Sequence, residues 1–172
     1  MSLHKPLSLK MRAIALLAQR EHSLSELRSK LLRLARAAQA VRQAEAPADE
    51  PLDELAEPAD VADEVEQLLV WLQARGYLDE TRFVESRVHA RAGRYGNLRI
   101  KQELAQHGLS LGEEAQARLK DSELERAQAV WQRKFGATPP EDAAARAKQT
   151  RFLAGRGFSA EVIRRVLRGL PD

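Results

Sequence analysis

One seven-residue corner occurs twice in this chain, and it limits the possible folds more than any other feature. The copies are residues 104–110 (Leu-Ala-Gln-His-Gly-Leu-Ser) and residues 153–159 (Leu-Ala-Gly-Arg-Gly-Phe-Ser). In each copy a glycine can end one helix, and the serine two residues later can cap the start of the next helix. A corner repeated in this way indicates a chain built from repeated helical units.

The rest of the sequence favours helix as well. Ala, Leu, Arg, Glu and Gln are abundant, aromatic residues make up only 5% of the chain, and apolar residues recur at helical spacing. We therefore predict an all-α fold of three tandem three-helix repeats, at residues 1–78, 79–120 and 121–172. Repeats this small bury too little surface to be stable alone, so we expect them to pack on their neighbours in an elongated array.

The first repeat carries an acidic insertion. A box formed by Ser23 and Glu26 predicts the start of its second helix, whose apolar stripe ends at Leu34. We expect the insertion at about residues 36–60. Its core, residues 44–60, is acidic and contains three prolines, so we predict that it is disordered or loosely ordered. The alternative is an acidic tether that competes with nucleic acid for a basic surface.

The charges are distributed unevenly along the chain. The net charge is only +3, but residues 43–74 carry ten carboxylates and no Lys or Arg. The remaining residues hold 28 basic and 15 acidic side chains, a net charge of +13. Such a body favours a polyanion, or the acidic surface of a nucleic-acid-binding protein, as its partner, although basic helical domains without such partners also exist.

The sequence contains no pattern that indicates catalysis. Cysteine is absent, the four histidines are scattered, and no glycine lies in a phosphate-binding loop motif. We therefore predict a binding protein and not an enzyme, with no cofactor and no metal site. The chain has no signal-peptide pattern and no long apolar run, so we expect a cytoplasmic monomer that does not bind membranes.

Two basic clusters are the candidate binding sites. The central cluster surrounds a glycine break, Gly93-Arg-Tyr-Gly96, between two predicted helices. It comprises Arg87, Arg91, Arg94, Tyr95, Arg99 and Lys101. The C-terminal ridge lies on one side of the last predicted helix and comprises Arg164, Arg165 and Arg168. The alternative for both is an ordinary solvated helix face. We expect Tyr95 to be the aromatic residue most exposed for contact. Five aromatic residues fall on apolar stripes and are expected to lie in the core: Trp71, Phe83, Trp131, Phe152 and Phe158.

Several segments, taken together and in order, resemble the RecX family of bacterial recombination regulators. They are Ser23-Leu-Ser-Glu-Leu-Arg-Ser-Lys-Leu, residues 76–86, residues 96–108, Lys134-Phe-Gly and residues 151–167. The resemblance implies three tandem three-helix repeats in a curved, elongated molecule. It also implies binding to the RecA recombinase and to the RecA–DNA filament, with inhibition of its ATPase and strand-exchange activities in recombination and repair. We expect only weak, sequence-independent binding to DNA alone.

A different class of function is also consistent with the pattern. Three-helix units with a basic helix resemble helix-turn-helix modules, which bind specific DNA sequences.

The acidic insertion departs from the RecX pattern, which usually has a short glycine corner at that point. We expect function to be densest at the central cluster, where the two glycines leave the backbone open to a partner. Asn97 can cap the second of the two helices there, and we expect these two helices to be held together by Phe83, Val84, Val88, Leu98 and Leu104.

Overall fold

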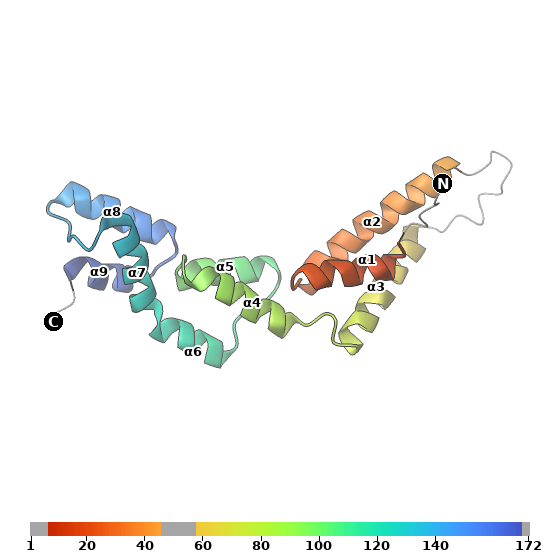
Figure 1. Ribbon diagram of the computed structural model, residues 1–172, viewed down its shortest axis with the longest axis horizontal. Helices are drawn as coiled ribbons and strands as arrows, with labels where there is room; N and C mark the ends of the chain where they lie inside the picture. The colour runs from red at the N-terminus through yellow and green to blue at the C-terminus, as the bar shows by residue number, and fades with distance from the viewer. Residues whose placement is uncertain (1–6, 46–57, 170–172) are drawn as a thin grey trace. The chain divides into compact units, whose positions relative to one another are not determined.

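The computed structural model describes residues 7–45 and 58–169, and within these ranges every regular element is an α-helix (Figure 1). The all-α prediction is confirmed. The helices are α1 (Leu9–Gln19), α2 (Leu24–Glu45), α3 (Pro58–Ala74), α4 (Glu80–Ala92), α5 (Asn97–Gln106), α6 (Glu113–Asp121), α7 (Glu123–Phe135), α8 (Ala143–Gly155) and α9 (Ala160–Arg168). None of the described helices combines the length and the apolar character needed to cross a membrane.

The chain divides into two units, Met1–Phe83 and Val84–Asp172, which we call unit 1 and unit 2. Unit 1 holds α1 to α3 and the first turn of α4, and unit 2 holds the remainder of α4 and α5 to α9. The predicted second and third repeats therefore lie almost entirely within one unit. The division into three repeats and their elongated, curved arrangement stay predictions.

The core of unit 1 forms where one face of α2 packs against one face of α3. Leu27 and Leu31 of α2 and Val65 and Leu72 of α3 are fully buried. Their spacing along each helix is that of one apolar face. Burial of side chains of this size contributes about 1.5–3 kcal/mol each. An ion pair between Arg28 and Glu66, 2.5 Å apart, joins the exposed edges of the same two helices.

The predicted start of α2 at Ser23 is confirmed. Its hydroxyl oxygen accepts a hydrogen bond from the amide of Glu26 at 3.2 Å. The Glu26 carboxylate accepts hydrogen bonds from the Arg20 guanidinium and forms an ion pair with the Lys30 ammonium at 3.2 Å. The hydrogen bond from Arg20 is the main reason that the pKa of Glu26 is lowered to about 2. These contacts fasten the corner between α1 and α2.

The structure corrects the bounds of the acidic insertion. We expected it to begin at about residue 36, but α2 continues to Glu45. The reason is composition: residues 35–45 are rich in alanine and contain no Gly or Pro, so nothing in them ends a helix. At the other end, α3 begins at Pro58, a residue favoured at the first helical position. The prediction of disorder for residues 44–60 is wrong at both ends, because residues 44–45 belong to α2 and residues 58–60 to α3. Residues 46–57, the remainder of that prediction, lie outside the described residues.

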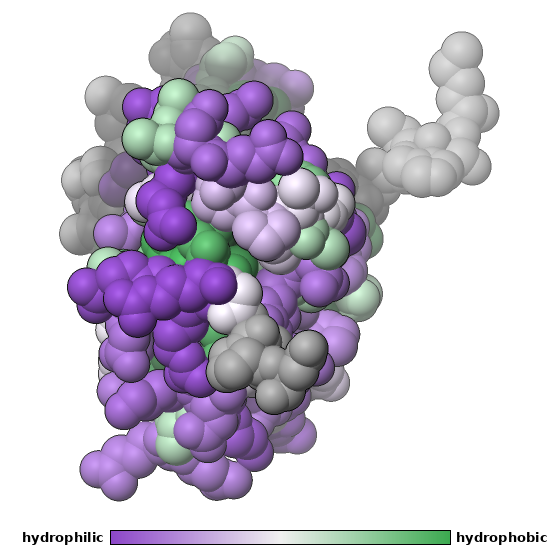
Figure 2. Space-filling model, turned by 90° about the vertical axis from the view of Figure 1, so that its left-hand side faces the viewer, coloured by the Kyte–Doolittle hydropathy of each residue, from purple (hydrophilic) through white to green (hydrophobic). Residues whose placement is uncertain are grey.

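The core of unit 2 is formed by α7, α8 and α9. It contains Ala127, Val130, Trp131, Leu153, Phe158, Ile163, Val166 and Leu167. The indole N–H of Trp131 donates to the side-chain oxygen of Gln149 at 2.7 Å, so the polar atom of this large side chain has a partner. The predicted burial of Trp131, Phe158 and Phe83 is confirmed. Figure 2 views the end of unit 2 that carries α8 and α9, where hydrophilic side chains surround a small apolar area.

The repeated corner is only partly the same in its two copies. Gly108 and Gly157 both have positive φ, +71° and +84°, as expected for glycines that end helices. In the second copy Ser159 caps α9, because its hydroxyl oxygen accepts from the amide of Val162 at 3.4 Å. In the first copy Ser110 is not the cap, because α6 begins later and its N-cap is Gly112. The serine of the first corner was therefore assigned the wrong role.

Candidate functional site

The central turn of unit 2, residues 93–96, is docked directly on the turn between α8 and α9. The amide of Gly96 donates to the carbonyl of Arg156 at 2.9 Å, and the amide of Leu98 donates to the carbonyl of Gly157 at 3.1 Å. A Cβ atom on Gly96 would lie 2.3 Å from the Gly157 carbonyl oxygen, so only glycine fits there. The expectation that this turn is open to a partner is thus wrong at Gly96, which is buried, although Gly93 is exposed.

Arg126 of α7 also holds the central turn. Its guanidinium donates to the carbonyls of Ala92 (3.1 Å), Tyr95 (2.8 Å) and Leu119 (3.0 Å) and to Oδ1 of Asn97 (2.5 Å). Burial lowers the pKa of Arg126, but an arginine remains charged near neutral pH. The side-chain nitrogen of Asn97 donates to the Leu119 carbonyl at 3.1 Å. Asn97 is therefore not the cap predicted for α5, whose N-cap is the preceding glycine.

Three arginines surround the ring of Tyr95. The guanidinium carbons of Arg91, Arg99 and Arg156 lie 5.6, 5.7 and 5.4 Å from the ring centroid, which is the range of cation–π contacts. Glu103 offsets part of this charge, because it lies 2.9 Å from Arg91 and 3.7 Å from Arg99. The structure thus brings Arg91, Tyr95 and Arg99 together as one group.

Two expectations about exposure were wrong. Tyr95 is only partly exposed, whereas Tyr77 of unit 1 is 45% exposed and stacks on Trp71 with ring centroids 5.6 Å apart. We also placed Leu98 in the contact between α4 and α5, but it is 54% exposed, and Ile100 is buried instead. Both cases arise from the docking of the central turn, which fixes the rotation of α5 and covers part of Tyr95.

The remaining members of the central cluster occupy different surroundings. Arg94 and Lys101 are exposed, and Arg87 is partly buried. Arg87 lines a cleft of about 310 Å³ with Arg91, Arg99, Gln102, Glu103, Gln106 and His107. Because Glu103 is one of its walls, this cleft is less positive than its arginines alone would make it.

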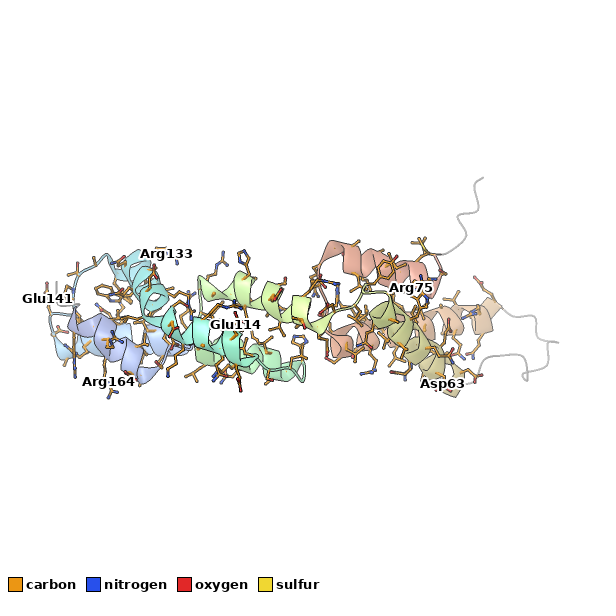
Figure 3. All side chains as sticks on the ribbon, turned by 90° about the horizontal axis from the view of Figure 1, so that it is seen from below. Asp63, Arg75, Glu114, Arg133, Glu141 and Arg164 are labelled. Atoms are coloured by element: carbon orange, nitrogen blue, oxygen red, sulfur yellow. The ribbon has the colours of Figure 1, made fainter. Side chains whose placement is uncertain are left out.

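The C-terminal ridge is confirmed as an exposed row of charge on α9. Arg164, Arg165 and Arg168 are exposed, and the opposite face of the helix is buried. Figure 3 places Arg164 and Arg133 at opposite edges of unit 2. The ridge lies on α9, whereas the central cluster lies on α4, on α5 and on the turn between them. The structure therefore holds two separate basic areas.

The sequence prediction missed three basic residues that lie beside the central turn. Arg133 and Lys134 at the end of α7, and Arg156 after α8, line a cleft of about 180 Å³ together with Arg94. Arg133 donates to the carbonyl of Gly93 at 2.9 Å. The motif Lys134-Phe-Gly gave a family signal, but nothing local indicates that the end of α7 meets a turn 40 residues earlier in the chain.

Comparison with known proteins identifies two domains. The model of the second three-helix domain of RecX matches residues 79–111, and the model of the third three-helix domain of RecX matches residues 121–167.

Relatives of similar length extend the comparison to nearly the whole chain. A regulatory protein RecX from Ralstonia nicotianae is 46% identical over 168 residues, covering 96% of this chain and 89% of the relative. The protein of the same name from Ralstonia pickettii is 43% identical over 171 residues, covering 98% of this chain and 91% of the relative. The protein of the same name from Pseudomonas entomophila is 43% identical over 172 residues, covering 97% of this chain and 94% of the relative. At this identity and coverage, the chain belongs to the RecX family.

Proposed function

We propose that this protein binds the RecA recombinase and the RecA–DNA filament, and that it inhibits RecA ATP hydrolysis and strand exchange. Family membership supports a regulatory role, because the relatives are named regulatory proteins. The observation that carries the proposal further is the docked central turn. It gathers Arg91, Arg94 and Arg99 with Arg156 in one unit, fixed by backbone hydrogen bonds and by Arg126.

A rigid positive surface suits a filament that is itself a polyanion. The filament contains DNA, whose negatively charged phosphates are repeated along the strand. Charges held in place by the fold lose little conformational freedom on binding, so more of their attraction appears as affinity. Binding to DNA alone is expected to be weak and independent of sequence, because phosphates carry no sequence information.

The decisive experiment is a RecA ATPase assay on single-stranded DNA with two triple variants. The first replaces Arg94, Arg99 and Lys101 with alanine. Arg91 is left intact because its contact with Glu103, at 2.9 Å, is closer than that of Arg99, at 3.7 Å. The second removes the same amount of charge from the C-terminal ridge through Arg164→Ala, Arg165→Ala and Arg168→Ala. Three contacts of about 0.5 kcal/mol each correspond to roughly tenfold weaker inhibition for the first variant.

The two variants separate the candidate surfaces. We expect both proteins to keep the thermal midpoint of the wild type, because these exposed side chains contribute within about half a kcal/mol each to stability. If only the ridge variant loses potency, the interaction surface is the ridge and not the central cluster. If the wild-type protein leaves ATP turnover unchanged, the proposed function itself is wrong.

Selection from a random duplex pool tests the helix-turn-helix alternative. A filament regulator enriches no motif, whereas a sequence-specific DNA-binding protein enriches one site with dyad symmetry or a fixed half-site spacing. Recovery of such a site would favour the alternative.

A further inference from the structure

A second feature of unit 2 goes beyond the predicted clusters: a small basic cleft between the central turn, α7 and α8. Its volume is about 180 Å³, and it is lined by Gly93, Arg94, Val130, Arg133, Lys134, Phe152 and Arg156. Four of these seven residues are cationic and none is acidic. Among the described residues, no carboxylate forms an ion pair with any of the four cations.

Two of the four cations are positioned by backbone carbonyls. Arg133 donates to the carbonyls of Ala129 at 3.3 Å and Gly93 at 2.9 Å, and Arg156 donates to the carbonyl of Arg94 at 3.4 Å. A carbonyl orients a guanidinium without neutralising it, and each guanidinium has five N–H donors, so donors remain for a ligand. The cleft is therefore preorganised for an anion.

The cleft differs from the other basic cleft of unit 2 in a way that indicates the ligand. The larger cleft contains Glu103, which pairs with two of its arginines. The smaller cleft has four unneutralised cations around a space of about 180 Å³. One phosphate group fits such a space and accepts from several N–H donors at once.

Aromatic surface beside the cleft favours a single strand over a duplex. Phe152 is partly exposed in the wall of the cleft, and the guanidinium carbon of Arg156 lies 5.1 Å from its ring centroid. Bases of a single strand can stack on aromatic rings and arginine planes, whereas paired bases in a duplex cannot.

We propose that this cleft binds a backbone phosphate of single-stranded nucleic acid. Arg94, Arg133, Lys134 and Arg156 supply the donors, and Phe152 supports the adjoining base. The proposal deepens the proposed function and rests on it for its biological setting, because the filament contains such a strand. It assigns a binding role to Arg133, Lys134 and Arg156, which the sequence prediction left out.

The test uses the full chain with Arg94→Gln and Lys134→Gln together. Both side chains are exposed and form no ion pair within the described part of the chain, so their replacement should leave the fold intact. The matched control is Arg33→Gln with Arg36→Gln, two exposed residues of α2 in unit 1. It removes the same charge far along the chain from the cleft.

Binding of a fluorescently labelled oligothymidine is measured by anisotropy at several salt concentrations. Loss of two phosphate contacts should reduce the slope of log affinity against log salt by about 1.4, at about 0.7 per contact on a single strand. The same two contacts correspond to roughly 10-fold to 30-fold weaker binding at 0.1 M salt. The control should keep the wild-type slope. Arg94→Lys with Lys134→Arg, which preserves the charge, should restore most of the affinity.

Three results would overturn the proposal. One is a slope for the glutamine variant equal to that of the control. Another is competition by a polyglutamate peptide as strong as competition by an unlabelled oligonucleotide of equal charge, which would indicate an acidic protein surface as the ligand. The third is a wild-type protein that binds no single strand even at low salt.

The RecA ATPase assay run in parallel separates the two proposals. If inhibition weakens in the glutamine variant while its oligonucleotide binding is unchanged, the phosphate cleft is refuted and the regulatory function stands. If the wild-type protein binds oligothymidine through the cleft but leaves RecA turnover unchanged, the regulatory function is refuted and the cleft stands.

Discussion

Substitution of Gly96 by alanine should open the docked turns of unit 2. The added Cβ would lie 2.3 Å from the Gly157 carbonyl oxygen and 2.3 Å from the amide nitrogen of Phe158, whereas real Cβ contacts rarely fall below 3.0 Å. The obstructing atoms are backbone, so no side-chain rotation can relieve the clash. The two turns must therefore separate or the local backbone must distort.

The expected cost follows from the contacts that are lost. Separation would break the bonds from Gly96 to the Arg156 carbonyl and from Leu98 to the Gly157 carbonyl. Each such bond contributes about 0.5–1.5 kcal/mol net, and overpacking of a tight contact costs about 1–3 kcal/mol. We therefore expect Gly96→Ala to destabilise unit 2 by about 2–6 kcal/mol.

The assay is urea unfolding followed by tryptophan fluorescence in a Trp71→Phe background. This background leaves Trp131 of unit 2 as the fluorophore, because the chain has two tryptophans. The matched control is Gly93→Ala in the same turn, where an added Cβ would meet nothing within 4 Å. The control should change stability by less than about 1 kcal/mol. Equal unfolding midpoints for Gly96→Ala and Gly93→Ala would refute the inferred backbone contact.

Three further predictions concern polar groups that are buried or partly buried. Arg126→Met should destabilise unit 2 by about 2–4 kcal/mol, because it leaves the oxygens that accept from Arg126 without their donor; an unchanged urea midpoint would contradict this. Burial lowers the pKa of His22, whose neutral ring contacts the Arg20 carbonyl at 2.9 Å and the Lys30 ammonium at 3.1 Å. Because the unfolded state binds the proton more readily, the neutral His22 ring stabilises unit 1 fully above about pH 6.5, and this stabilisation is lost as the pH falls through the folded pKa. His22→Gln should therefore flatten the stability–pH profile in this pH range. The pKa of Glu26 is lowered to about 2, so the ionised carboxylate stabilises unit 1 above about pH 4.5, and this stabilisation is lost as the pH falls toward 2. Glu26→Gln should remove this loss of stability at acid pH. If the variant still loses stability in that range, other carboxylates are responsible.

The sequence predicts the local structure well because its signals are local. Gly108 and Gly157 end helices, whereas Ser23 and Ser159 cap the starts of α2 and α9. The predicted end of α2 is wrong because the apolar stripe ends at Leu34, whereas helix-forming residues continue to Glu45.

The errors at the candidate site arise from contacts between distant segments. Asn97 can cap a helix or bond elsewhere, and only the presence of Arg126 decides between these roles. Likewise, helical spacing alone does not decide whether Leu98 or Ile100 faces the core, because the docked turn sets the rotation of α5. The basic cleft combines residues from three segments, so no single stretch of sequence contains it.

The docked turns also determine when this part of the protein can finish folding during synthesis. Gly96 leaves the ribosome before its hydrogen-bond partner at residue 156, and the intervening residues take roughly 3–12 s at about 5–20 residues per second. For that interval the amides of Gly96 and Leu98 have only water to bond. The second three-helix domain is thus completed by the third, and a nascent chain that stalls between them presents its basic turn to chaperones and proteases.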